Sequence, residues 1–214
     1  MAGLTQTKSQ EVLGRILGVR GAGRWEDELN EVLKYALILD KKFFKWLEKN
    51  GEAILKRKNF KIIEQAIYQS CCHKAYVVKK DEKEKNIRAI LNFGHTFAHA
   101  YEAGLGYSHK LNHGEAVILG MKTALSFSFK ENMLNKSEYN LIINHIDNSG
   151  LPSSIKKYFS ISDLNKILSF MIKDKKNNSE KINLVLLKKI GKPIFNKQYS
   201  KKKLNLFLKK FLTN

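Results

Sequence analysis

The sequence is poor in cysteine and proline and contains no long hydrophobic segment. Its two cysteines, Cys71 and Cys72, are adjacent, so a bridge between them would be strained and no disulfide framework is available. The two prolines, Pro152 and Pro193, leave most of the chain free to form long helices. No apolar run approaches the roughly 20 residues that span a bilayer, and the N-terminus has no signal-peptide pattern. We therefore expect a reduced, cytoplasmic protein without a membrane partner.

Acidic residues are also scarce, because 39 lysines and arginines face only 20 aspartates and glutamates, which gives a net charge of +19. Such a charge indicates either a polyanionic partner or a composition biased toward lysine. The lysines are spread over the whole chain, and neither zinc-finger spacing nor an aromatic RNA-binding signature is present. We favour the composition bias, expect no nucleic-acid partner, and expect the field to attract a small phosphorylated or carboxylated substrate.

The apolar spacing predicts a mainly α protein, a multi-helix bundle with one small β-hairpin. Residues 1–26 are rich in Gly, Ser, Thr and Gln and sustain no helical or strand period, so we treat them as an atypical N-terminal segment before a helical domain at 27–214. Helices are predicted at 25–37, 41–49, 53–73, 88–102, 113–131, 137–148, 162–172 and 202–212. A short β-branched segment follows at 74–80, a charged loop at 81–85, and a hairpin pairs 181–187 with 191–195.

Four of the six histidines lie between positions 95 and 113. His95 and His99 are four residues apart on a predicted helix, a spacing that presents two imidazoles to one metal ion. Thr96 stands where zinc proteases carry glutamate, which argues against a protease. His113 begins the next helix and is placed to be a third ligand. The structural alternative for His99 is a core histidine satisfied by one hydrogen bond, and for His113 it is a helix-capping polar residue beside an exposed loop.

Arg88 and Asn92 extend this group, because on the helix predicted over 88–102 they form one polar stripe with His95 and His99. Arginine suits carboxylate or phosphate, and asparagine can meet a hydroxyl as donor or acceptor. Further positive charge could come from Lys34, Lys74 and the pair Lys175 and Lys176, although in a chain this rich in lysine each of them alone is typical of a surface.

The segments LNFGHTFAHAYE at 91–102 and LNHGEAVILGM at 111–121 closely resemble the 3-dehydroquinate synthase family of sugar phosphate cyclases. The resemblance covers about 27–214 and implies that Glu31, His95 and His113 hold zinc or cobalt, while His99 faces the substrate. It further implies that Lys34, Lys74, Arg88, Asn92 and one of Lys175 or Lys176 bind the substrate, with Glu84 in a secondary role. Bare spacing had instead paired His95 with His99.

The implied reaction converts a seven-carbon keto sugar acid phosphate (DAHP) into 3-dehydroquinate and phosphate, a step of the shikimate pathway of aromatic amino-acid biosynthesis. In that family NAD takes a hydride and returns it, phosphate leaves by elimination, and the opened ring closes by an aldol reaction. Members carry an N-terminal NAD-binding domain and are homodimers, whereas only about 26 residues precede the match here. We therefore expect a C-terminal fragment that is inactive alone or works with a separate NAD-binding chain.

Three other functions stay open. Another sugar phosphate cyclase would share the metal ligands. A metal-dependent polyol dehydrogenase would share the architecture, but a neutral polyol does not need Lys34, Lys74 and Arg88. A basic helical binding module with structural histidines is the non-enzymatic alternative, and a zinc titration separates it from the cyclase.

Overall fold

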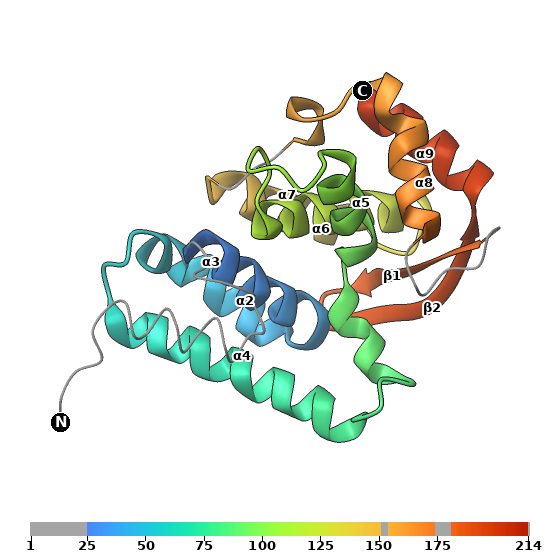
Figure 1. The fold of residues 1–214 in the computed structure, drawn as a ribbon. Helices are drawn as coiled ribbons and strands as arrows, with labels where there is room; N and C mark the ends of the chain where they lie inside the picture. Colours follow the sequence, from blue (N-terminus) through green and yellow to red (C-terminus); the bar gives the residue numbers. More distant parts are fainter. Residues whose placement is uncertain (1–24, 151–153, 174–180, 214) are drawn as a thin grey trace.

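The computed structural model describes residues 25–150, 154–173 and 181–213 (Figure 1). Its α-helices are α2 (Trp25–Leu39), α3 (Lys41–Leu55), α4 (Phe60–Lys80), α5 (His95–Gly104), α6 (His113–Lys130), α7 (Lys136–Asn148), α8 (Leu164–Lys173) and α9 (Lys201–Thr213). Short 3-10 helices lie at η1 (Ile87–Asn92), η2 (Ile155–Lys157) and η3 (Ile161–Asp163). Strands β1 (Lys181–Lys189) and β2 (Lys192–Ser200) lie between α8 and α9 in the sequence. The mainly α fold with one hairpin is confirmed.

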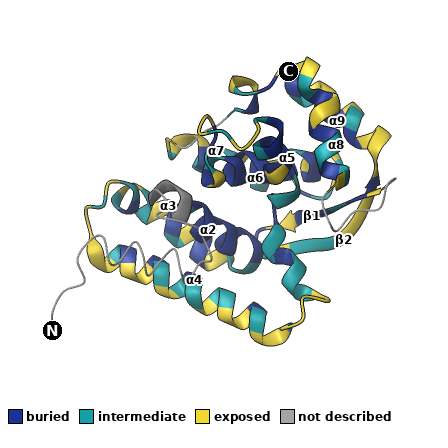
Figure 2. Ribbon diagram, in the orientation of Figure 1, coloured by how far each residue is buried: buried dark blue, intermediate teal, exposed yellow. Residues whose placement is uncertain are grey.

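Helix α6 runs through the middle of the hydrophobic core. Almost every residue from Ala116 to Leu125 is buried, which follows from a sequence that is apolar on all faces of the helix. Helices α2, α5 and α7 and strand β1 all pack against it. Helix α4 is different, because only a few of its residues are buried and the others are half-buried or exposed, as the alternating colours in Figure 2 show. The core therefore centres on α6, with α4 as an outer wall.

The β-hairpin is attached to the helical core by hydrogen bonds. Strands β1 and β2 pair antiparallel, with Lys181 opposite Ser200 and Lys189 opposite Lys192, so the pairing is longer than the predicted 181–187 and 191–195. Gly191 in the turn donates its backbone N–H to the carbonyl of Leu37 at 2.8 Å. On the other side, Ser128 of α6 accepts a hydrogen bond from the backbone N–H of Leu187 at 3.0 Å. These bonds fix the hairpin to α2 and α6.

Three predicted helix boundaries, the end of one helix and both ends of the next, were wrong because tertiary packing overrode local signals. Helix α3 passes through Asn50 and Gly51, where a stop was predicted, and ends at Leu55 after burying Ile54. Helix α4 then begins at Phe60, capped by the Asn59 side chain, and continues through the β-branched 74–80 to Lys80. Val77 is fully buried there, and that burial outweighs the small helix penalty of a β-branched residue.

The predicted single helix over 88–102 was also wrong. Residues 87–92 form the 3-10 helix η1, and α5 starts only at His95. Gly94 between them has a φ of 81°, in the left-handed region that an α-helix cannot use. The polar stripe of Arg88, Asn92, His95 and His99 therefore does not exist as one helix face.

The remaining predicted helices agree with the structure within one or two residues, as does the loop at 81–85. Both cysteines are free thiols. Within the described ranges, no helix has the combination of length and apolar character needed to cross a membrane. The predicted atypical segment at 1–26 lies almost wholly outside the described residues.

Candidate metal and substrate site

Eight of the residues predicted for the site line one pocket of about 240 Å³. They come from α2, α4, the loop after α4, η1, α5 and α6, elements far apart in the sequence. We call it the histidine pocket, and its lining is Glu31, Lys34, Tyr35, Lys74, Glu84, Arg88, Leu91, Asn92, His95 and His113. Thus the fold brings together the histidines and the cationic groups that the sequence left separate.

His95 and His113 lie close together because helix α5 packs tightly on helix α6, with two glycines at the contact. A Cβ at Gly120 of α6 would overlap the carbonyl oxygen of Gly94 and lie 2.9 Å from the backbone nitrogen of Ala98. A Cβ at Gly94 would in turn lie 2.7 Å from the backbone nitrogen of Met121. With no side chains between the backbones, the start of α5 approaches α6, and the rings of His95 and His113 come to 6.1 Å between centroids.

Both histidine rings are held through Nδ1. The Nδ1 of His95 lies 3.2 Å from the carbonyl oxygen of Phe93, and that of His113 lies 3.0 Å from Oε1 of Glu102. A carbonyl and an ionised carboxylate only accept, so each Nδ1 carries the proton and donates it. Neutral rings of this tautomer present the Nε2 lone pair, which is how histidine ligands are commonly oriented by an oxygen partner.

Glu31 is the third predicted ligand, and its carboxylate is engaged by a lysine one turn away. The Nζ of Lys34 donates to Oε1 of Glu31 at 2.6 Å, with the Lys34 side chain 3% exposed and that of Glu31 12% exposed. Among the described residues no three acidic, histidine or cysteine side chains converge closely enough to hold an ion. One carboxylate and two Nδ1-anchored imidazoles nevertheless fit the donor set of a zinc site with an open position, provided that Glu31 turns from Lys34.

The pKa values of the two imidazoles are shifted in opposite directions. Burial, followed by the nearby positive charge of Lys34, holds the pKa of His95 well below its ordinary value, so this ring is neutral near pH 7. The hydrogen bond to Glu102 raises the pKa of His113. His95 is thus already in its ligand form, whereas His113 must release a proton more often before it can bind a metal.

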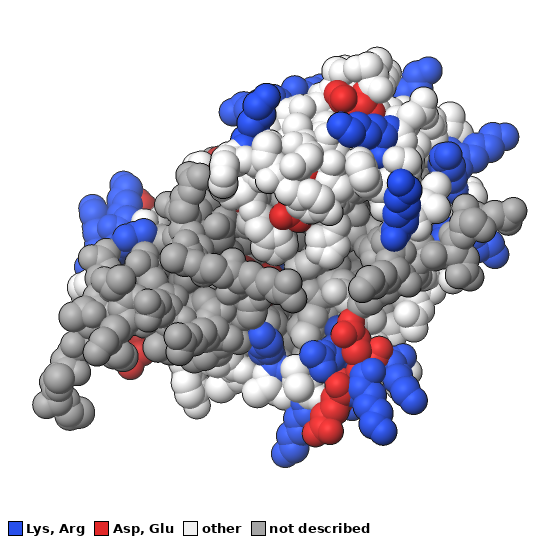
Figure 3. All heavy atoms as spheres, in the orientation of Figure 1, with Lys and Arg blue, Asp and Glu red and all other residues white. Residues whose placement is uncertain are grey.

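The cationic wall of the pocket is anchored by the loop after α4. The carboxylate of Asp81 accepts from the backbone N–H groups of Lys85, Asn86 and Arg88, the last at 2.9 Å. The Arg88 guanidinium donates to the carbonyl of Glu82 at 2.8 Å. Figure 3 shows acidic and basic side chains interleaved around the end of α4 and this loop. The loop therefore presents Arg88 in a defined direction and does not form a uniformly basic patch.

Lys74 and Asn92 complete that wall. Burial lowers the pKa of Lys74, the positive charges of Lys34 and Arg88 act the same way, and Glu31 opposes them. Asn92 donates its amide N–H to Glu84 at 3.3 Å. Three cations and two carboxylates therefore share one small pocket, and an anionic ligand would relieve the repulsion among the cations.

Other predicted residues lie outside this lining. His99 is exposed on α5, with its ring edge against His95 at 5.7 Å between centroids. Lys175 and Lys176 fall outside the described residues, so their predicted contact with substrate stays a prediction. Of the residues in the histidine motif, Glu115 has a structural role, since it accepts from the backbone N–H of Asn112 at 2.9 Å and caps α6.

Sequence reasoning missed the contact that holds His113. Glu102 stands seven residues after His95, two turns along the same helix, and a carboxylate on that face was the available signal. The contact of His95 with the Phe93 carbonyl could not be predicted from the sequence. That backbone oxygen is available to His95 because the helix is interrupted at Gly94.

Comparison with known proteins identifies the family of this chain. Residues 29–177 match the family model described as the 3-dehydroquinate synthase C-terminal domain. A 3-dehydroquinate synthase of Pelagibacter ubique is 59% identical over 183 residues, covering 86% of this chain and 50% of that protein. The one of Bradyrhizobium diazoefficiens is 37% identical over 187 residues, covering 85% and 48%. The chain spans about half the length of these relatives.

Solved structures share the fold at low identity. The 2-epi-5-epi-valiolone synthase of Streptomyces hygroscopicus, described with NAD+ and Zn2+ bound, superposes with a TM-score of 0.73 at 20% identity, covering 91% of this chain and 53% of that one. A 2-deoxy-scyllo-inosose synthase, described as complexed with carbaglucose-6-phosphate, NAD+ and Co2+, gives 0.70 at 22% identity, covering 88% and 52%. By the match to the family model and by its identity to these relatives, the chain belongs to the 3-dehydroquinate synthase family and corresponds to its C-terminal domain.

Proposed function

We propose that this chain supplies the metal- and substrate-binding half of a 3-dehydroquinate synthase, a phosphate-eliminating lyase that converts DAHP into 3-dehydroquinate and phosphate. The observation that supports it is the histidine pocket, in which Glu31, His95 and His113 stand opposite Lys34, Lys74 and Arg88. A metal donor set and a cationic wall in one pocket suit a substrate that carries a hydroxyl to be oxidised together with a phosphate and a carboxylate.

Zinc or cobalt held by Glu31, His95 and His113 would act as a Lewis acid on that hydroxyl. The protein's own groups bind and orient the rest of the substrate. Arg88 is directed by its bond to Glu82 and can meet a phosphate or carboxylate with two parallel N–H groups. Lys34 and Lys74 add positive charge at partly or fully buried positions, where screening by water is weak.

Hydroxyl recognition falls to the polar groups at the pocket edge. Asn92 can donate to or accept from a substrate hydroxyl when it leaves Glu84, and His99 stands on the adjoining surface of α5. Lys175 or Lys176 is proposed to complete the phosphate site. The residues of this chain thus hold both ends of the substrate, and Glu84 keeps Asn92 in position before the substrate arrives.

NAD, the hydride acceptor of the proposed reaction, would be bound elsewhere in the enzyme, since the described residues contain one antiparallel hairpin and no parallel nucleotide-binding sheet. A separate NAD-binding chain, a homodimer and a cytoplasmic location stay predictions. A metal-dependent polyol dehydrogenase is disfavoured by the three cations, whereas a cyclase acting on another sugar phosphate would use the same pocket.

A chimera tests the proposal. The C-terminal half of the Pelagibacter ubique relative is replaced by residues 27–214 of this chain, and formation of dehydroquinate and phosphate from DAHP is measured with NAD and zinc. The chimera should be active, and Glu31→Ala or Arg88→Ala in it should abolish or strongly reduce turnover. A folded chimera that binds zinc but releases no phosphate, or that oxidises neutral polyols instead, would refute the assignment.

A further inference from the structure

A second pocket, of about 430 Å³, lies between α6, α7, η2 and α9 and shares no residue with the histidine pocket. We call it the lysine pocket. Its lining is Lys122, Ser126, Lys130, Tyr139, Ile143, Ser154, Ile155, Lys156, Phe207, Lys210 and Phe211. The volume lies in the range of small-molecule sites.

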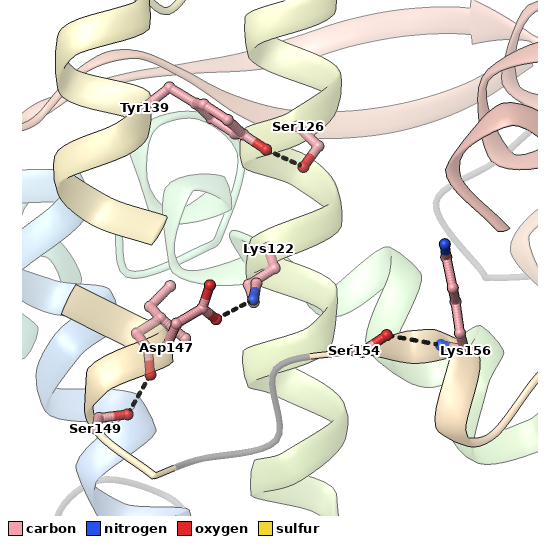
Figure 4. A network of polar contacts seen from close by, with 8 residues as sticks. Lys122, Ser126, Tyr139, Asp147, Ser149, Ser154 and Lys156 are labelled. Atoms are coloured by element: carbon pink, nitrogen blue, oxygen red, sulfur yellow. Dashed lines mark hydrogen bonds and ion pairs between the residues drawn. The ribbon is translucent and has the colours of Figure 1, made fainter. Parts of the chain in front are cut away.

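The polar side of this pocket is built around helix α6 (Figure 4). Lys122, buried at 9% exposure, points from α6 to Asp147 of α7 and forms an ion pair with it. One turn further along α6, Ser126 shares a hydrogen bond with the hydroxyl of Tyr139 at 3.1 Å. Ser154 precedes η2 and accepts the backbone N–H of Lys156 at 3.3 Å. These bonds give the pocket a defined wall.

The other three lysines of the lining lack a carboxylate. Lys130, Lys156 and Lys210 form no ion pair with any described residue, and the lining contains neither aspartate nor glutamate. Some exposed lysines elsewhere are paired, for example Lys41 with Glu138 at 2.9 Å and Lys203 with Glu131 at 2.6 Å. In a lysine-rich chain single unpaired lysines are ordinary, but three around one concave surface raise its potential together.

The floor of the pocket is aromatic. The rings of Phe207 and Phe211 stack at 5.5 Å between centroids, and the ammonium group of Lys130 lies 5.9 Å from the Phe207 centroid. Tyr139 forms part of the same lining and stacks on Phe129 at 4.7 Å. A ligand that filled this space would need an apolar ring against these faces and an anionic group toward the lysines.

We propose that the lysine pocket is a second ligand site, which binds a small aryl phosphate or aryl carboxylate. The ring would lie against Phe207, Phe211 and Tyr139, and the anionic group would be held by Lys156 and Lys210. This site is independent of the proposed reaction, because the histidine pocket uses none of these residues.

Calorimetric titration of the full chain with phenyl phosphate and with inorganic phosphate tests the proposal. The titrations use a Lys74→Ala/Arg88→Ala background, so that the histidine pocket does not contribute. Phenyl phosphate should bind more tightly than phosphate, and adding Lys156→Ala/Lys210→Ala should weaken it by about tenfold, since two charge-assisted contacts are lost. Phe211→Ala should weaken phenyl phosphate but leave phosphate binding unchanged.

The matched control is Lys45→Ala/Lys61→Ala, which removes the same charge at exposed positions of α3 and α4. It should change the affinity by less than about twofold, because these lysines lie outside the pocket and exposed charges interact weakly. Equal losses in both double variants, equal affinities for the two phosphates, or displacement of phenyl phosphate only by an oligonucleotide would each overturn the proposal. Thermal unfolding confirms that every variant is folded.

Discussion

The histidine pocket and the lysine pocket both use helix α6, yet they treat positive charge in opposite ways. In the histidine pocket the cation Lys34 forms an ion pair with the carboxylate of Glu31, and both residues are buried. In the lysine pocket Lys122 is the only lysine with such a partner among the described residues, and the other three lysines are exposed. Burial forces charges to be paired and directed, whereas exposure lets them stay unpaired at little cost.

This contrast bears on what each pocket can do. Buried, hydrogen-bonded groups keep one orientation, which a metal site or a reacting substrate requires. Exposed lysines recognise an anion by its charge, whereas the aromatic side chains of the lysine pocket select the shape of the ligand. Five variants test the roles given to burial and pairing, and they follow in order of decreasing expected effect.

Loss of a metal ligand should have the largest effect. His95→Ala is expected to weaken zinc binding roughly a thousandfold, about 4 kcal/mol, because one of three ligands is removed. Competition with a zinc-binding dye measures it. His109→Ala, at an exposed loop position, is the control and should bind zinc as the parent chain does. Undiminished binding in His95→Ala would place the metal elsewhere.

Gly120→Ala should destabilise the whole domain by about 3 kcal/mol, since the added Cβ overlaps the Gly94 carbonyl and forces α5 from α6. Denaturant unfolding measures the change. Gly51→Ala is the opposite control: its Cβ would lie an ordinary 3.7 Å from Cε1 of His145, inside helix α3. It should stabilise the domain by about 0.5 to 1 kcal/mol. If Gly120→Ala and Gly51→Ala changed the unfolding free energy equally, the close packing of α5 on α6 would be refuted.

Glu102→Ala should weaken zinc binding between about tenfold and a hundredfold, because His113 loses the oxygen that orients its ring. Glu102→Gln, which retains an acceptor, should lie between the parent and the alanine variant. Glu115→Gln serves as a control, because Glu115 caps α6 and should affect stability more than zinc affinity. If Glu102→Ala binds zinc normally, its carboxylate does not position the ligand.

Asp147→Ala should cost about 1 kcal/mol of unfolding free energy, because it leaves the mostly buried ammonium of Lys122 without its carboxylate. The cost is small because the Asp147 side chain is 42% exposed and water screens the pair. Glu52→Ala breaks a pair whose partners are both exposed, with Lys56, and should produce no measurable change. A larger loss in the exposed pair would contradict the role given to burial.

The smallest effect concerns a half-buried histidine, His145, which lies outside both the histidine pocket and the lysine pocket. Burial lowers the pKa of His145, whose ring edge faces Phe44 at 5.3 Å. Its neutral form is the native one, so stability is full above about pH 6.5 and falls as the pH drops through the lowered pKa. His145→Gln should therefore lose a few tenths of a kcal/mol less than the parent between pH 7.5 and 5.5. Equal losses of unfolding free energy in the parent and in His145→Gln over that pH range would contradict the prediction.

Much of the fold follows from local patterns. The apolar run of 113–131 predicts α6, and the alternation after 181 predicts the hairpin. The failures occur where burial competes with local signals, at Gly51, which lies inside a helix, and at Val77, which a helix buries. Composition gave no hint that Arg88 and Asn92 belong to a different helix from His95, because the break depends on how Gly94 packs on α6.

The sequence by itself determined the family, the helical class and the set of residues with site chemistry, because motif spacing and residue type are local properties. Only the tertiary structure decided which of them share a pocket, that Glu31 meets Lys34, that Glu102 holds His113, and that lysines from three separate elements surround one aromatic floor. These are contacts between distant segments, and their energies depend on burial and distance, which exist only once the chain has packed.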